Sequence, residues 1–199
     1  MDRAPERAFD EYLVSLSKEG SIEALDGLAR RWTPRLLRYA TRVLGGSGDA
    51  VETARDVVQD TWVGVIRGLR SLRDPAQFPA WIYGIATRKC ADAIRANTHR
   101  RQLNTRAATD SLGEQGAVPT WEDQIDVAAA IRGLPPTHRA VVHLFYREDF
   151  KVEEIASVLG IPAGTVKSRL HNAREALKQQ LDDAASGRNE PTSYKRGTS

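Results

Sequence analysis

Every periodic segment of this chain repeats its apolar residues at the spacing of an α-helix, and no stretch alternates apolar and polar residues for long enough to predict a β-strand. The clearest stripe consists of Leu25, Leu28, Trp32, Leu36 and Tyr39. With 199 residues, 41% of them hydrophobic, the chain can bury a core, which excludes global disorder. The sequence therefore predicts an all-α fold of one or two small domains.

Three long helices are predicted in the N-terminal half. The first begins after the cap residue Ser21 and ends at Gly45, and Pro34 predicts a kink or a restart with Thr33 as a second cap. The second spans about 49–69 and the third about 79–97, with a turn-rich break over 73–78 between them. The core stripe predicted for the second helix is Val58, Trp62, Val65, Ile66 and Leu69. That of the third is Ile82, Ile85, Ala86, Cys90, Ala93 and Ile94.

The second and third helices each carry another stripe, away from the predicted core. On the second helix its members are Asp56, Gln59, Asp60 and Val63. On the third helix they are Trp81, Gly84, Arg88 and Arg95. A tryptophan beside arginines suits single-stranded nucleic acid, because bases stack on the ring and phosphates pair with guanidinium groups. A core tryptophan beside a solvated basic face is the simpler interpretation, and these residues taken alone favour it.

Charge is segregated between the two halves of the chain. Residues 88–106 carry six Lys or Arg against one Asp, a net charge of +5, whereas residues 107–126 carry five acidic residues and no Lys or Arg, a net charge of −5. The acidic stretch also contains Gly113, Gly116 and Pro119 and lacks helical periodicity. We therefore expect domains over 1–100 and 123–183, joined by a flexible acidic linker over 101–122, and a disordered tail over 184–199.

The C-terminal half predicts a helix-turn-helix. A helix over 137–146 precedes a short helix over 151–160, and the connector 161–164 leads to a helix over 165–178. Ala156 is small where two helices cross, Gly160 permits a positive φ in the turn, and Val166 packs the helices together. Donors that can reach phosphates and base edges then point outward, namely Lys167, Ser168, His171, Asn172 and Arg174. A plain helical hairpin with a charged surface is the weaker interpretation.

The sequence offers little support for a disulfide-stabilised, metal-binding, enzymatic or membrane protein. The one cysteine, Cys90, rules out a disulfide framework within the chain and is expected to be an inert core thiol. No zinc-ligand set, phosphate-binding glycine loop or Ser/His/Asp set is evident, so we expect no enzymatic activity, no metal and no cofactor. The first ten residues lack the apolar region of a signal peptide, and no apolar run is long enough to span a membrane. We therefore expect a cytoplasmic protein without membrane contact.

Both halves together resemble one family, the extracytoplasmic-function (ECF) sigma factors of bacterial RNA polymerase. The N-terminal half is similar to sigma region 2 in the motifs Asp56-Val-Val-Gln-Asp-Thr-Trp62, Phe78-Pro-Ala-Trp-Ile-Tyr-Gly-Ile-Ala86 and Ala91-Asp-Ala-Ile-Arg95. The C-terminal half is similar to region 4 in Leu134-Pro135, Glu153-Glu-Ile-Ala156, Leu159-Gly-Ile-Pro-Ala-Gly-Thr-Val-Lys-Ser-Arg-Leu170 and Ala173-Arg174. The resemblance covers about residues 21–182, which is far more specific than a lone helix-turn-helix.

The resemblance implies a factor that binds core RNA polymerase, recognises the −10 and −35 promoter elements and helps to melt the promoter. The residues implied to dock on the clamp helices of the polymerase β′ subunit are Asp56, Gln59, Asp60 and Val63. Those implied to read the melted −10 strand, with Trp81 as the wedge at the duplex edge, are Asp74, Gln77, Phe78, Trp81, Arg88, Lys89 and Arg95. Those implied to read the −35 duplex are Thr165, Lys167, Ser168, Arg169, His171, Asn172 and Arg174. The β flap and an anti-sigma factor are the other implied partners.

Some residues depart from the family pattern, and two other classes of function remain open. Gly84 stands where many relatives carry Arg, and Arg88 where many carry Asn, so the promoter sequence does not carry over. A stand-alone helix-turn-helix regulator would dimerise on palindromic half-sites and would not need the 56–62 face. A single-strand nucleic-acid binding or scaffold protein would use the basic stretch 88–106 and would not need 167–174. Stable binding of core polymerase distinguishes the sigma factor from both.

Overall fold

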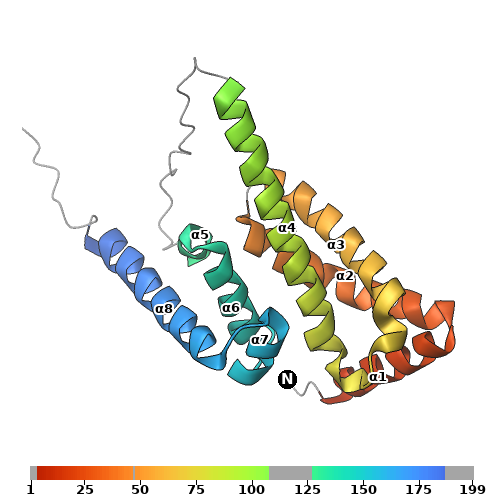
Figure 1. The fold of residues 1–199 in the computed structure, drawn as a ribbon. Helices are drawn as coiled ribbons and strands as arrows, with labels where there is room; N and C mark the ends of the chain where they lie inside the picture. Colours follow the sequence, from red (N-terminus) through yellow and green to blue (C-terminus); the bar gives the residue numbers. More distant parts are fainter. Residues whose placement is uncertain (1–3, 47, 108–126, 187–199) are drawn as a thin grey trace, which may run out of the picture.

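The computed structural model describes residues 4–46, 48–107 and 127–186, and all regular structure in these ranges is helical (Figure 1). The N-terminal group consists of α1 (Ala4–Glu19), α2 (Ile22–Leu44), α3 (Gly48–Gly68), the short 3-10 helices η1 (Leu69–Ser71) and η2 (Pro75–Gln77), and α4 (Phe78–Ala107). The C-terminal group consists of α5 (Val127–Gly133), α6 (Pro136–Tyr146), α7 (Val152–Leu159) and α8 (Ala163–Ser186). The predicted all-α fold with two helical groups is confirmed.

Helix α2 is the central helix of the N-terminal group. It begins where the Ser21 hydroxyl accepts a hydrogen bond from the Ala24 amide at 3.1 Å, and it ends at Gly45, whose φ is 111°. The helix runs unbroken through Pro34, so the predicted restart at Thr33 is wrong. An internal proline costs about 3 kcal/mol, whereas burying one large apolar side chain contributes about 1.5–3 kcal/mol. Buried side chains on both sides of the proline, Trp32 and Leu36 among them, therefore keep α2 in one piece.

Helices α3 and α4 differ from their predicted forms in two places. Ile66, predicted in the core stripe, is 63% exposed, because the turn of about 100° after the buried Val65 carries it onto the solvent side. Helix α4 continues to Ala107, past its predicted end near residue 97 and into the predicted linker. Adding a turn to an existing helix costs less free energy than nucleating a new helix. Residues 108–126, which hold the rest of that linker, and residues 187–199 lie outside the described residues.

The core is built around aromatic rings that meet edge to face. Trp32 lies 5.5 Å from Phe78 and 5.9 Å from Tyr83, and Tyr83 lies 5.0 Å from Tyr39, measured between ring centroids. Most of the stripe predicted for α4 belongs to the same core, because Ile82, Ile85, Ala86 and Cys90 are all buried.

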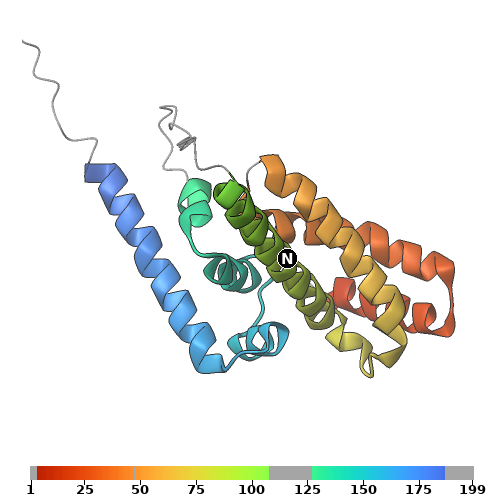
Figure 2. The ribbon, with the colours of Figure 1, turned by 45° about the horizontal axis from the view of Figure 1, so that its top comes forward.

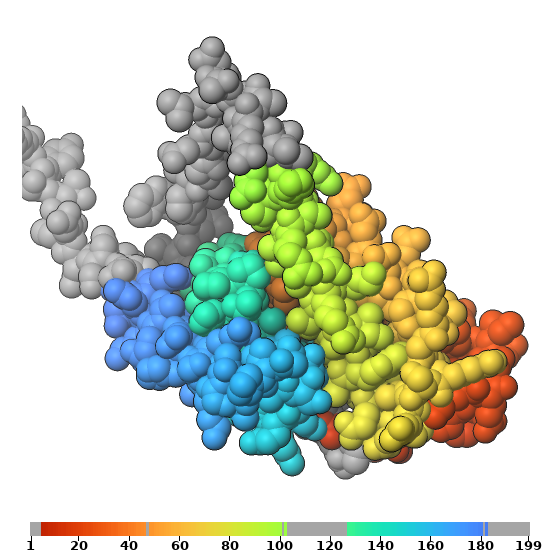
Figure 3. All heavy atoms as spheres, in the orientation of Figure 1, coloured from red at the N-terminus to blue at the C-terminus, as the bar shows by residue number. Residues whose placement is uncertain are grey.

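This core continues into the C-terminal group. Helices α2 and α4 contact α6 and α7, and residues of both groups belong to one apolar cluster. The two groups lie side by side when the molecule is turned (Figure 2), and α7 meets α4 along a continuous surface (Figure 3). The two helical groups therefore share one packed interior.

Cys90 provides a direct test of this core. The side chain is fully buried, and burial raises the pKa of the thiol to about 12. We expect the folded chain to resist alkylation by iodoacetamide at about pH 8, and the chain unfolded in guanidinium chloride to be alkylated fully. Mass spectrometry measures both. Equal rates for the folded and the unfolded chain would contradict the burial of this residue.

Candidate nucleic-acid and protein interfaces

One side of helix α3 presents a polar surface, the α3 face, made of Asp56, Gln59, Asp60 and Val63. All four side chains are exposed, whereas Val57, Val58 and Thr61 on the same helix are buried. The sequence-based separation of this face from the core is therefore correct in three dimensions.

Two contacts fix the position of the α3 face. Trp62 donates a hydrogen bond from Nε1 to the Thr33 hydroxyl at 3.0 Å, which ties α3 to α2. On the other side, the ammonium group of Lys89 lies 3.2 Å from the Asp60 carboxylate. This pair is partly exposed and contributes at most about 1 kcal/mol. Lys89 therefore contacts α3 in this structure, and its predicted role as a −10 contact stays a prediction.

The segment between α3 and α4 is held from two sides. Asp74 caps η2 by accepting a hydrogen bond from the Ala76 amide at 3.0 Å, and the neighbouring Gln77 is exposed. From α1, the ammonium group of Lys18 donates a hydrogen bond to the carbonyl oxygen of Leu72 at 2.6 Å. Sequence reasoning missed Lys18, because 54 residues separate the two partners and no motif marks the contact.

Phe78 and Trp81 follow this segment at the start of α4. Phe78 is fully buried against Trp32 and is part of the core, and its assignment as a DNA contact stays a prediction. Trp81 is half-buried, and its ring lies 6.1 Å from Phe78 between centroids. It also covers Gly68, where a Cβ atom would come within 3.0 Å of the indole ring. Trp81 is therefore anchored in the core and still reaches the surface.

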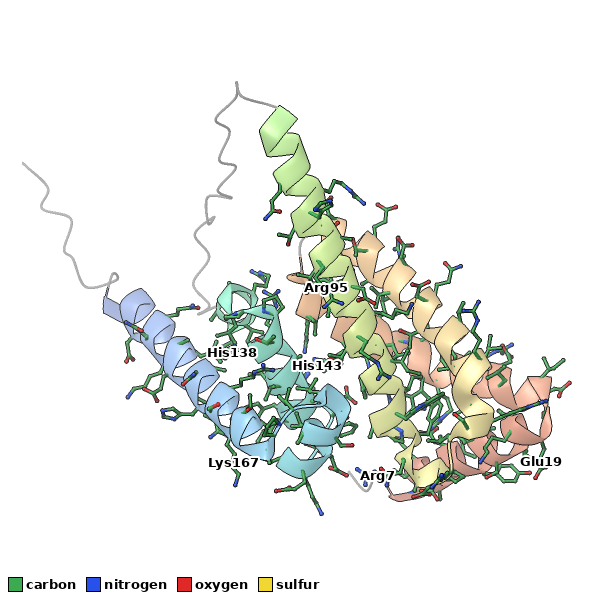
Figure 4. All side chains as sticks on the ribbon, viewed as in Figure 1. Arg7, Glu19, Arg95, His138, His143 and Lys167 are labelled. Carbon is green, nitrogen blue, oxygen red and sulfur yellow. The ribbon has the colours of Figure 1, made fainter. Side chains whose placement is uncertain are left out.

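The other residues of the polar stripe predicted on α4 are Gly84, Arg88 and Arg95, and they differ in exposure. Arg88 and Arg95 are exposed, and Arg95 pairs with Asp92 on the same helix (Figure 4). Gly84, between Trp81 and Arg88 on this stripe, is buried beneath α7. A methyl group at Gly84 would lie 3.3 Å from the carbonyl oxygen of Val158.

Helices α7 and α8 form the predicted helix-turn-helix. Glu154 closes the start of α7 by accepting a hydrogen bond from the Lys151 amide at 2.6 Å. Gly160 ends α7 with a φ of 63°, and the Ile161 amide donates to the Ala156 carbonyl at 3.1 Å. The glycine therefore has the left-handed conformation that the sequence predicts for the turn.

The outer surface of α8 carries most of the donors expected there. Val166, Leu170 and Ala173 are buried, as an inward stripe requires. The exposed set, which we call the α8 face, is Lys167, Ser168, His171 and Asn172. Lys167 projects from the first turn of the helix into solvent (Figure 4).

Three other residues predicted on this surface lie at its edges. Thr165 and Arg169 are half-buried, and burial together with the positive charge of Arg169 lowers the pKa of His138. The Arg174 guanidinium donates a hydrogen bond from Nε to the Tyr146 hydroxyl at 2.7 Å and lies 5.8 Å from the Phe145 ring centre. Arg174 is therefore exposed, like the α8 face, and also bonded to Tyr146 of α6.

Helix α6 carries two buried polar residues that sequence reasoning missed. Arg139 is 8% exposed, and His143 lies 3.3 Å from the Glu148 carboxylate. Burial tends to raise the pKa of Glu148, but the hydrogen bond and charge interaction with His143 outweigh it, so the pKa lies below its usual value. Within the described ranges, no three His, Cys, Asp or Glu side chains gather as metal ligands. None of the described helices combines the length and apolarity that a membrane span requires.

These surfaces fall inside two sigma-factor domains. Residues 28–100 match Sigma-70 region 2, and residues 124–177 match Sigma-70 region 4. The ECF RNA polymerase sigma factor SigL of Mycobacterium tuberculosis is 36% identical over 154 residues, which cover 74% of this chain and 83% of SigL. The chain belongs to the ECF family of RNA polymerase sigma factors. SigW of Bacillus subtilis, another ECF sigma factor, is 29% identical over 178 residues, 83% of this chain and 93% of SigW.

Solved sigma factors share the fold. CnrH, in complex with the cytosolic domain of CnrY, is 27% identical with a TM-score of 0.62 and covers 88% of this chain and 98% of its own. RpoE of Bartonella quintana, solved with the anti-sigma factor NepR, is 24% identical with a TM-score of 0.63 and covers 81% of this chain and 98% of its own.

The family defines the function of the chain. It is a promoter-specific initiation factor that acts with RNA polymerase, from a family of non-catalytic factors, and a stand-alone regulator is not favoured. Helix α1 lies outside the region 2 match, which begins at residue 28. The support that Lys18 gives to the segment before α4 therefore comes from outside that match.

The contact between Lys18 and Leu72 can be tested alone. In a Lys18→Met variant, we expect amide hydrogen exchange in residues 72–78 to accelerate by about ten- to a hundredfold, because a hydrogen bond to a charged group contributes about 1.5–3 kcal/mol. Exchange in α3 should not change. Lys178→Met, which removes an exposed lysine on α8, is the matched control. Unchanged exchange over 72–78 in Lys18→Met would show that the segment is held without this bond.

Proposed function

We propose that the α3 face docks on the clamp helices of the polymerase β′ subunit. The observation that carries this proposal is the exposure of Asp56, Gln59, Asp60 and Val63 on one side of a helix whose other side is buried in region 2. Carboxylates beside an exposed apolar side chain suit a partner surface that is basic and apolar. The C-terminal group contributes the contact with the β flap.

The −10 element is bound as a melted strand by the start of α4 and the segment before it. Trp81 supports this role because its ring is held by the core yet partly exposed, as a stacking platform requires. Arg88 and Arg95 bind the phosphates, and Asp74 and Gln77 flank the base that is flipped from the stack. Unstacking a base costs a few kcal/mol, and stacking on an aromatic ring returns about 1–3 kcal/mol.

The −35 element is bound as duplex by the α8 face. Lys167, Ser168, His171 and Asn172 support this role because all four are exposed near the start of the second helix of a helix-turn-helix. Thr165 and Arg169 at the edge contact the DNA backbone. Arg174 supports the same role, because its side chain is exposed and its Nη groups can reach a phosphate while Nε stays bonded to the Tyr146 hydroxyl.

An anti-sigma factor is the proposed regulatory partner, and the cytoplasm, where RNA polymerase acts, is the proposed location. The support is that a relative 27% identical to this chain has been solved with a protein partner, the cytosolic domain of CnrY.

Run-off transcription with purified core polymerase and a promoter library tests the proposed function. We expect specific starts only when the chain is present. The double variant Asp56→Arg with Asp60→Arg should reduce them at least about tenfold, because like charges at a docking surface cost several kcal/mol. Glu19→Arg with Asp26→Arg, two exposed acidic residues outside the α3 face, is the charge-matched control and should keep the starts.

Two results would contradict the proposal. Starts that survive the α3 variant but not the control would place the polymerase contact elsewhere. No starts and no core binding, with duplex DNA still bound, would favour a stand-alone regulator.

A further inference from the structure

A mostly apolar cavity lies where the end of α2 meets α5, α6 and α8. Its volume is about 570 Å³, within the range of about 300–1,000 Å³ that is typical of small-molecule sites. Apolar side chains of three helices line it, namely Ile131 of α5, Val142 of α6 and Leu177 of α8. Tyr146, which also lines it, is 52% exposed. The cavity therefore offers an apolar molecule a place out of water.

Arginines surround the same cavity, and within the described residues no Asp or Glu lines it. They come from all four of its helical elements and the residue after α6, and they are Arg42, Arg132, Arg139, Arg147 and Arg174. Low-dielectric walls that carry one sign of charge concentrate the electric field of that charge. An amphiphile with an apolar body and an anionic head therefore matches this cavity.

Arg139 shows that the charge is not neutralised within the chain. Its guanidinium donates from Nε and Nη2 to the carbonyl oxygen of Val43, at 3.1 and 2.7 Å. From Nη1 it donates to the carbonyl oxygens of Arg132 and Leu134, at 2.7 and 2.9 Å. These bonds tie α6 to α2 and α5, but carbonyl oxygens carry no net charge. The side chain is only 8% exposed, and a buried cation without a counter-ion is costly, so an anion nearby would be stabilised.

Arg42, in the last turn of α2, is partly buried among other cations. Burial lowers the pKa of its guanidinium, and the positive charges of Arg147 and Arg38 lower it further. The dipole of α2 supplies only about half a negative charge at this end, too little to balance both Arg42 and Arg139. None of the ion pairs formed by the described residues involves either arginine.

We propose that this cavity binds a long-chain fatty acid, with the alkyl chain on the apolar walls and the carboxylate beside Arg42 and Arg139. Arg42 donates hydrogen bonds to the carboxylate, and Arg139 adds its charge and the one N–H that its carbonyl partners leave over. An alkyl chain suits these walls better than a peptide, whose backbone groups would lack hydrogen-bond partners there. The inference does not rest on the proposed function, because it involves neither polymerase nor promoter DNA.

Isothermal titration calorimetry at about pH 8 tests the site on the unchanged chain. Octanoate, decanoate and dodecanoate differ only in CH₂ groups, and each buried CH₂ raises the affinity about fourfold. We expect one site, with a dissociation constant that falls about fifteenfold for each two CH₂ groups added. Dodecyltrimethylammonium, which pairs the same chain with a cationic head, should not bind. No binding of dodecanoate, no dependence on chain length, or equal binding of the cation would overturn the proposal.

Two variants test the two halves of the site. Arg42→Gln removes a charge-assisted contact with the carboxylate, so dodecanoate should bind at least about tenfold more weakly. Ile131→Glu places a carboxylate in the cavity and should abolish binding. Arg55→Gln of α3 and Ile22→Glu of α2, both exposed and far from the cavity lining, are the matched controls and should keep it. Unchanged affinity in both folded test variants would show that dodecanoate binds elsewhere.

Crosslinking locates the ligand without any substitution. A dodecanoate that carries a diazirine at the end of its chain is bound and irradiated, and mass spectrometry identifies the labelled peptides. We expect label on α5, α6 or α8, and competition by unmodified dodecanoate. Label confined to other helices would overturn the proposal, even if the variants prove unfolded by circular dichroism. None of these measurements contains polymerase or DNA, so their failure would leave the proposed function standing.

Discussion

The position of α4 depends on two tyrosines buried at its contact with α2. Tyr83 packs edge to face on Tyr39, and the Tyr39 hydroxyl shares a hydrogen bond with that of Thr87 at 2.6 Å. These contacts set the rotation of α4 about its own axis. With Tyr83 and Cys90 turned inward, the helical period carries Arg88 and Arg95 to the outside. The packing of the core beneath α4 therefore determines where the side chains of Arg88 and Arg95 lie.

The proposed binding surfaces are held in place by residues that make no proposed contact with a partner. Trp62 ties the α3 face to Thr33, and Lys18 holds the segment that leads into α4. Neither residue touches DNA in the proposed function, yet both fix the backbone from which the contacts project. Arg174 and Lys89 make contacts within the chain that sequence reasoning did not predict, a hydrogen bond to the Tyr146 hydroxyl and an ion pair with Asp60.

The sequence was sufficient for the elements that depend on local signals. The cap at Ser21, the glycine at position 160 and the inward stripe of α8 each follow from a residue type at a fixed offset. Prediction from sequence failed at Pro34, where packing keeps a helix intact through a proline. It also failed at Ile66, which lies at the edge of the apolar stripe of α3 and is exposed rather than buried. It could not find the pairing of Arg139 with Val43, because 96 residues separate the partners and the acceptor is a carbonyl that every residue carries.

The interface between the two helical groups also constrains any protein that would insert between them. Opening exposes Tyr83 and Phe150 to water and leaves the Arg139 guanidinium without the Val43 carbonyl. A partner that inserts between the groups must therefore offer apolar side chains for the rings and an oxygen acceptor for the arginine.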